Sequence, residues 1–175
     1  MRKIHIGMRK IKSLISVSLS FVIWEIIRIF LPMLEAHPVF AYIYAIIEMR
    51  ETPDKTKNFG KLRIKATFVG LIIGLLFVTA SVFFSQFIEG QWLSVFIEFL
   101  FILIGAFCSL CVAELVGCKN FCGIAAIIAV ICMVSHSGED RYLYAVMRVL
   151  QTLIGVFSAM VVNVVIKKKE SEEND

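Results

Sequence analysis

Four long apolar runs are the feature of this sequence that most restricts its fold. They cover residues 13–31, 66–84, 92–116 and 142–166. About 20 consecutive apolar residues are enough for a helix to cross the hydrocarbon core of a bilayer. Apolar residues make up 59% of the chain and charged residues 18%, whereas soluble domains carry roughly 45–50% and about 25%. The chain is therefore expected to be an integral membrane protein of the all-α class, and its composition argues against a soluble enzyme.

Two shorter apolar runs lie between the long ones, at residues 38–49 and 121–135. As helices they would be about 18 and 22 Å long at 1.5 Å per residue, which is short of a hydrocarbon core of roughly 30 Å. Both runs are nevertheless too apolar for surface loops. We expect six transmembrane helices, two of them short, and the sequence leaves open whether the short ones cross fully.

The distribution of Lys and Arg predicts the orientation of these helices. If the N-terminus is cytoplasmic, 15 of the 18 Lys and Arg lie on the inner side, and Arg28, Arg141 and Arg148 remain in the outer half. The inner stretches are residues 1–12, 50–65, 117–121 and 167–175. This asymmetry follows the positive-inside rule. The net charge of +4 then reflects topology and does not indicate nucleic-acid binding.

The same pattern divides the chain into three parts. A basic cytoplasmic N-terminus covers residues 1–12, the six-helix membrane domain covers residues 13–166, and a charged cytoplasmic tail covers residues 167–175. We expect the tail to be disordered or to lie at the lipid headgroups, because it is short and strongly charged.

A weak internal repeat relates the two halves of the chain at an offset of 85 residues. Residues 63–70 match residues 148–155 as R-[IV]-x-x-T-x-[VI]-G, and the same offset places Ala41 over Ala126 in the short runs. Each half then holds three crossings, so the second half must be inverted in the membrane. Inverted repeats with short segments in matching positions are typical of transporters. The sequence thus predicts an inverted repeat of three plus three helices.

Small residues in the third helix of each half predict close helix packing. Gly70 and Gly74 form a G-x-x-x-G pattern, and Gly155 with Ala159 repeats its spacing. Thr67 and Thr152 come three residues before Gly70 and Gly155. These hydroxyls could face a substrate path, or they could bond back to the carbonyls of their own helices. Packing alone would also account for the glycines.

Charged residues inside the apolar runs are costly, so each one indicates a function or a buried pair. Glu25 and Arg28 lie three residues apart on one helix face, where they can pair. Arg148 lies six residues inside its run with no acidic residue one turn away, and Glu98 is similarly deep in residues 92–116. Glu48, near an inner boundary, is expected to be solvated.

Five cysteines lie in or beside the fourth and fifth segments. We expect them to behave as small apolar residues, because the sequence shows no supporting ligands for a metal site. The chain also lacks the HExxH pattern and the phosphate-binding glycine loop that would indicate an enzyme. We therefore expect no metal, no cofactor and no catalytic residues.

Several motifs, taken in order, resemble those of the bacterial aromatic acid exporter family, a fusaric-acid-resistance-like (FUSC-like) group. The matching stretches are IGMRKIKS at residues 6–13, PVFA at 38–41, the spaced Gly60, Arg63, Thr67, Gly70 and Gly74, and RVLQTLIG at 148–155 followed by Val162-Asn163. The resemblance covers about residues 4–166. One departure is EMR at residues 48–50, where relatives tend to have a Gln-containing stretch.

This resemblance implies a six-helix domain in a bacterial plasma membrane that moves organic anions, usually outward. Plant malate-permeable anion channels are similar, more distantly. Family members commonly continue into a cytoplasmic domain or a second membrane half. Neither follows residue 175 here, so a homodimer is the expected way to complete the assembly.

The leading hypothesis is an exporter or permease of aromatic carboxylic acid anions. Arg148 and Arg28 would attract the carboxylate from the outer half, Arg63 would guard the inner mouth, and Glu25 would tune Arg28 or carry a coupling proton. Thr67 and Thr152 are further candidates along the path. A passive anion channel and a non-transport scaffold subunit remain as alternatives. The expected partners are the lipid bilayer, a small organic anion and a second copy of the chain.

Overall fold

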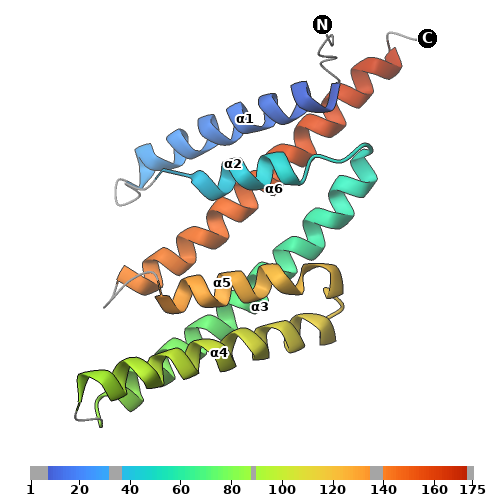
Figure 1. The fold of residues 1–175 in the computed structure, drawn as a ribbon. Helices are drawn as coiled ribbons and strands as arrows, with labels where there is room; N and C mark the ends of the chain where they lie inside the picture. Colours follow the sequence, from blue (N-terminus) through green and yellow to red (C-terminus); the bar gives the residue numbers. More distant parts are fainter. Residues whose placement is uncertain (1–7, 32–36, 88–89, 135–139, 173–175) are drawn as a thin grey trace, which may run out of the picture. The chain divides into compact units, whose positions relative to one another are not determined.

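The computed structural model is built of helices throughout the part of the chain that it describes, residues 8–31, 37–87, 90–134 and 140–172. Figure 1 shows the elements in order: α1 (Met8–Phe30), α2 (Val39–Ile47), α3 (Pro53–Ser85), α4 (Gln91–Leu115), the 3-10 helix η1 (Lys119–Phe121), α5 (Cys122–Val134) and α6 (Asp140–Glu172). The predicted all-α class with six helices is confirmed, and α2 and α5 are the two short ones. Arg2 and Lys3 of the predicted N-terminal stretch, and Ser135 at the end of the fifth run, lie outside the described residues.

Among the residues that the structure describes, four helices are long and apolar enough to cross a membrane. They are α1, α3, α4 and the part of α6 from Val146 to Ile166. With nine residues, α2 is about 14 Å long. α5 with the preceding η1 is also shorter than a simple span.

Two of the long helices extend well beyond the apolar runs. α3 begins at Pro53 rather than near residue 66, and α6 continues to Glu172, so the charged residues 167–172 are helical and not disordered. The start of α3 is set by local chemistry. Thr52 Oγ1 accepts a hydrogen bond from the Lys55 amide (3.4 Å) and caps the helix. Pro53 is the first residue of α3, a position whose N–H has no partner within the helix, so proline is tolerated there. A helix of 33 residues is about 50 Å long, which leaves room for charged turns outside the hydrocarbon.

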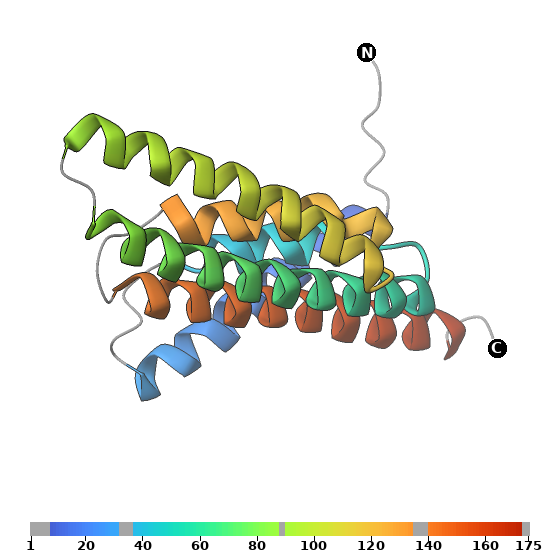
Figure 2. The same cartoon turned by 90° about the horizontal axis from the view of Figure 1, so that it is seen from below.

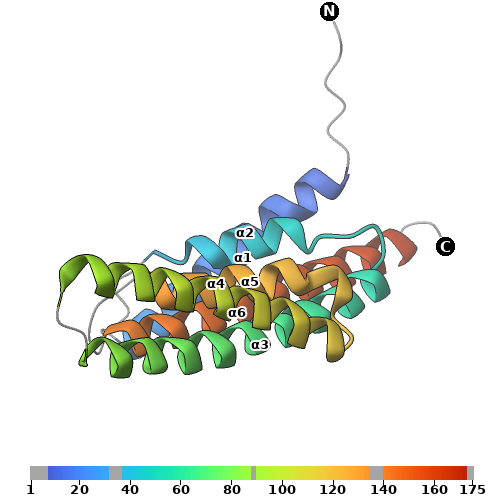
Figure 3. The same ribbon diagram turned by 60° about the horizontal axis from the view of Figure 1, so that its bottom comes forward.

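The described helices form two compact units. Unit 1 lies within residues 1–61 and 150–175, and unit 2 comprises residues 62–149. In unit 1, α1 packs against α2 (Figures 1 and 3). In unit 2, α5 lies along α4 (Figure 2). Most of α3 belongs with α4 and α5, and most of α6 belongs with α1 and α2.

α1 turns its polar face toward the protein and its apolar face outward. Every fourth residue from position 12 is buried: Lys12, Ser16, Ser20 and Trp24. The exposed residues are large and apolar, as Leu14 and Val22 show. Polar groups in membrane helices generally face the bundle interior in this way, so the outer face of α1 suits contact with lipid.

Candidate substrate path

In unit 2, α3 and α5 approach each other closely enough for backbone contact. A Cβ atom placed on Gly70 would collide with the carbonyl group of Ala125. A Cβ atom on Gly74 would lie 2.9 Å from the Cβ of Cys132 and 3.0 Å from the Cα of Ala129. Because later residues of α3 meet later residues of α5, the two helices run in the same direction. The two glycines thus lie at the contact of α3 with α5.

Two arginines of unit 2, Arg63 and Arg148, lie near opposite ends of α5. The Arg63 guanidinium stacks over Phe121, with its carbon 5.5 Å from the ring centroid, directly before α5 begins. Arg63 is 5% exposed. Arg148 interacts electrostatically with Cys132, in the last turn of α5. Cys122 to Cys132 spans ten residues, or about 15 Å of helix, so the groups with which the two arginines interact lie near opposite ends of α5.

Thr67 lies one turn along α3 from Arg63, on the stretch that leads to Gly70. Its side chain is fully buried, and its Oγ1 has no hydrogen-bond partner among the described residues. It therefore does not bond back to a carbonyl of its own helix. A hydroxyl left in this state inside a membrane is costly. Water or a polar guest passing along α5 would satisfy it.

In unit 1, α6 approaches the short helix α2 in a similar way. A Cβ atom on Gly155 of α6 would lie 2.5 Å from the carbonyl oxygen of Ala41 and 2.8 Å from the Cβ of Tyr44 in α2. One turn later, Ala159 packs with Met49 and Val162. Both units thus contain a glycine that lies against the backbone of a short helix. Gly155 lies against Ala41 and Gly70 against Ala125, so these contacts do not reproduce the predicted pairing of Ala41 with Ala126, and the inverted repeat stays a prediction.

The remaining candidates of the predicted path belong to unit 1. Glu25 Oε2 and Arg28 NH2 are 2.7 Å apart near the end of α1, and both side chains are partly exposed. Thr152 is almost completely buried in α6. Unit 1 also holds buried polar atoms with no hydrogen-bond partner in the described part of the chain, among them Ser16 Oγ and Ser158 Oγ. Arg28, the arginine of the predicted path that lies in unit 1, is already paired with a carboxylate.

Sequence reasoning missed a buried polar cluster at the turn between α2 and α3. Asn163 Nδ2 donates to the carbonyl oxygen of Arg50 (3.0 Å) and to Thr56 Oγ1 (2.8 Å). The Arg50 amide donates to the same Thr56 oxygen (3.2 Å), and its guanidinium lies over Phe59, 4.4 Å from the ring centroid. The available signal was Asn163 itself, because an amide near the end of an apolar membrane helix needs hydrogen-bond partners.

Glu48 is enclosed beside this turn, and the expectation that it is solvated was wrong. The residue is fully buried as the C-cap of α2. α2 ends at Ile47, so Glu48 and the equally buried Met49 follow directly after the helix, inside unit 1. The departure from the family pattern at residues 48–50 therefore lies in a packed position.

The cysteines are free thiols. Across the ranges that the structure describes, no group of three or more His, Cys, Asp and Glu side chains could hold a metal ion.

Long apolar helices with inward-facing polar and cationic side chains define a polytopic α-helical membrane protein. Residues 17–162 match the fusaric acid resistance protein-like family, and the chain belongs to this family. This membership indicates a membrane transporter or exporter of the resistance type, a family of transporters rather than enzymes. Neither a curated protein nor a solved structure shows a significant match.

Proposed function

We propose that the chain exports organic anions of the aromatic carboxylic acid class across a bacterial plasma membrane. The observation that carries this proposal is the position of Arg63 and Arg148 near the two ends of α5, together with the buried Thr67 hydroxyl, which lies one helical turn after Arg63 and has no hydrogen-bond partner among the described residues. Arginine stays charged at any working pH and offers a planar fork that matches a carboxylate. The two cations thus provide an entry site and an exit site for one anion.

The spacing of the two arginines suits passage rather than tight binding. In this proposal the carboxylate binds one guanidinium group at a time, Arg63 beside Phe121 and then Arg148 near Cys132, so neither site holds the anion with the full charge of the pair. Conduction of this kind requires sites that are favourable enough to enter and weak enough to leave. With the N-terminus in the cytoplasm, as the Lys and Arg distribution predicts, the anion meets Arg63 first and leaves past Arg148.

Glu25 and Arg28 have a different role in this proposal. Their ion pair cancels the charge of Arg28 near the outer end of α1. Protonation of Glu25 would release Arg28 to attract a carboxylate. This pair is therefore the proposed place where a proton gradient acts on transport.

The test is uptake of a labelled hydroxybenzoate into proteoliposomes, with and without a pH gradient. The Arg148→Gln variant is expected to lower the initial rate at least about tenfold at equal reconstituted amounts, since it removes a charge-assisted contact of more than about 1.4 kcal/mol. Arg148→Lys keeps the charge but loses the planar, two-pronged guanidinium group. Its initial transport rate is expected to lie between that of the parent and that of Arg148→Gln. Lys57→Gln, at an exposed position of α3, is the matched control and should transport like the parent.

Each outcome has a defined meaning. Accumulation against a gradient supports secondary transport, and equilibration without accumulation supports a passive channel instead. An Arg148→Gln variant that transports at the parental rate removes Arg148 from the path. If no aromatic carboxylate moves, the proposed substrate class is wrong, and a partner isolated in fixed stoichiometry would favour the scaffold alternative.

A further inference from the structure

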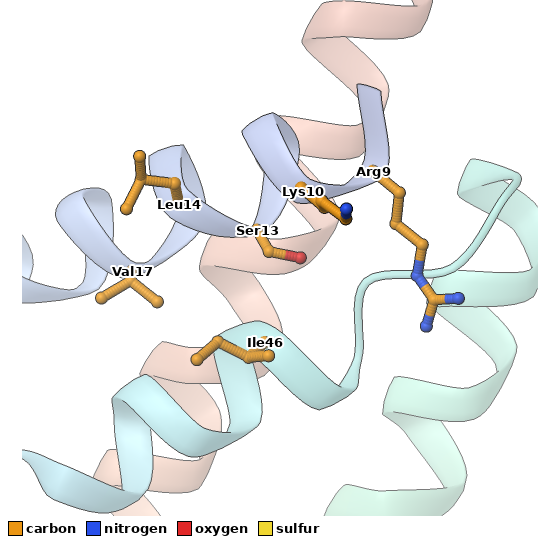
Figure 4. Close-up of a pocket in the computed structure, with 6 residues that line it drawn as sticks. All are labelled: Arg9, Lys10, Ser13, Leu14, Val17 and Ile46. Carbon is orange, nitrogen blue, oxygen red and sulfur yellow. The ribbon is translucent and has the colours of Figure 1, made fainter. Parts of the chain in front are cut away.

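An open groove lies between the start of α1 and the end of α2 in unit 1 (Figure 4). It has a volume of about 600 Å³. Its lining residues are Arg9, Lys10, Ser13, Leu14 and Val17 of α1 and Ile46 of α2. None of these residues belongs to the proposed substrate path.

The lining changes from cationic to apolar along α1. Arg9 and Lys10 come first, the Ser13 hydroxyl follows, and Leu14 and Val17 continue the wall. In Figure 4, Arg9 extends toward the segment that links α2 and α3. Arg9 to Val17 covers eight residues, or about 12 Å, which is less than half of a hydrocarbon core of roughly 30 Å. The groove therefore fits within one leaflet.

The apolar part of the groove opens onto side chains that suit contact with lipid. Leu14 is 69% exposed and Ile46 is 52% exposed. Neighbouring positions on the same helices, Ile15 and Ile43, are also exposed and apolar. A small hydrophilic anion at the cationic end would leave this wall uncovered, whereas an acyl chain would cover it.

We propose that this groove binds an anionic phospholipid. Arg9, Lys10 and the Ser13 hydroxyl hold the phosphate, and the first part of an acyl chain lies along Leu14, Val17 and Ile46. The two cations select an anionic headgroup over a zwitterionic one. With the N-terminus in the cytoplasm, the site lies in the leaflet whose anionic lipids attract basic segments next to the membrane.

The test uses the full chain, purified in mild detergent and incubated with equal amounts of phosphatidylglycerol and phosphatidylcholine that carry the same acyl chains. Native mass spectrometry then measures the ratio of the two lipids retained. The parent is expected to retain mainly phosphatidylglycerol. The double variant Arg9→Gln, Lys10→Gln is expected to lower this preference about tenfold or more, from the usual contribution of each basic residue near anionic lipid.

The matched control is Lys57→Gln with Lys61→Gln, which removes the same charge from exposed positions of the same unit. It should keep the parental ratio. Lys10→Gln alone should give an intermediate loss, and it serves if the double variant fails to fold. Equal retention of both lipids by the parent, or the same loss in the control, would overturn the proposal.

A second arm separates a lipid from a free anion. Inorganic phosphate in excess should not displace phosphatidylglycerol, because it lacks the chain that covers the apolar wall. Val17→Ser with Ile46→Ser should weaken lipid retention although both cations remain. Displacement by phosphate, or unchanged retention in this variant, would show that the groove is a simple anion site and not a lipid site.

Discussion

A single amide ties the turn between α2 and α3 to α6. Asn163 donates to the Arg50 carbonyl and to Thr56 Oγ1, and its side chain is fully buried. Replacement of Asn163 by Ala removes both bonds and leaves the partly buried Arg50 carbonyl without this donor. We expect a loss of about 1–3 kcal/mol in the free energy of unfolding.

Thermal or denaturant unfolding in detergent measures this loss. Asn58→Ala is the matched control, because Asn58 is an exposed asparagine in the first turns of α3. Surface changes of this kind usually stay within about 0.5 kcal/mol. Equal effects of the two substitutions would show that the Asn163 bonds do not stabilise the turn.

The residues that carry charge or an amide inside apolar runs could be found from the sequence, but their grouping could not. Arg63 and Arg148 stand out because a cation is costly in a membrane. That Arg63 stacks on Phe121 just before α5 and Arg148 interacts electrostatically with Cys132 within it depends on tertiary packing between residues far apart in the chain, as does the placement of the Arg28 pair in the other unit. The burial of Glu48 could not be predicted from the sequence either, because it depends on where α2 ends and on what packs around that end.

At the scale of helices, the contact of α3 with α5 leaves no room for a methyl group. Gly70→Ala would push a Cβ into the carbonyl of Ala125, and backbone cannot move aside as a flexible side chain can. We expect the helices to separate, at a cost of about 1–3 kcal/mol, with a matching loss of transport in the hydroxybenzoate assay.

Gly123→Ala is the control for this substitution. A Cβ on Gly123 meets nothing within 4 Å, and alanine is favoured over glycine in a helix by up to about 1 kcal/mol. The free energy of unfolding should therefore decrease in Gly70→Ala and increase in Gly123→Ala. If Gly70→Ala proved as stable as the parent, close approach would not be what holds α3 to α5.

Helix existence could be predicted well and helix ends poorly, for a physical reason. Long apolar runs identify the part of a helix that lipid surrounds, and α4 agrees with its run to within one residue at each end. The start of α3 is instead set by Thr52 and Pro53, which form a cap in a polar stretch. Apolar patterning does not detect such a start.

At the scale of the whole molecule, α4 presents a long apolar face on which Glu98 is exposed. A carboxylate facing lipid at this depth is costly, whereas one enclosed by a second protein surface can find polar partners. We therefore expect α4 to lie at the interface of the predicted homodimer. In a cysteine-free background, Glu98→Cys should cross-link two copies in membranes, while Val22→Cys on the outer face of α1 should not.

If Val22→Cys cross-links and Glu98→Cys does not, the interface lies on the outer face of α1 and not on α4. A chain that runs as a monomer in mild detergent and forms no cross-link at either position would contradict the expected dimer.

The division of α3 and α6 between the two units has a consequence for synthesis on the ribosome. α1 and α2 pack with residues 150–163 of α6, which are synthesised only after α3, α4 and α5. Until those residues are inserted, the face of α2 at Ala41 lacks its packing contact with Gly155 and depends on the insertion machinery for protection. A nascent chain interrupted before residue 150 therefore contains all of unit 2 but lacks part of unit 1, and we expect cellular quality control to degrade it.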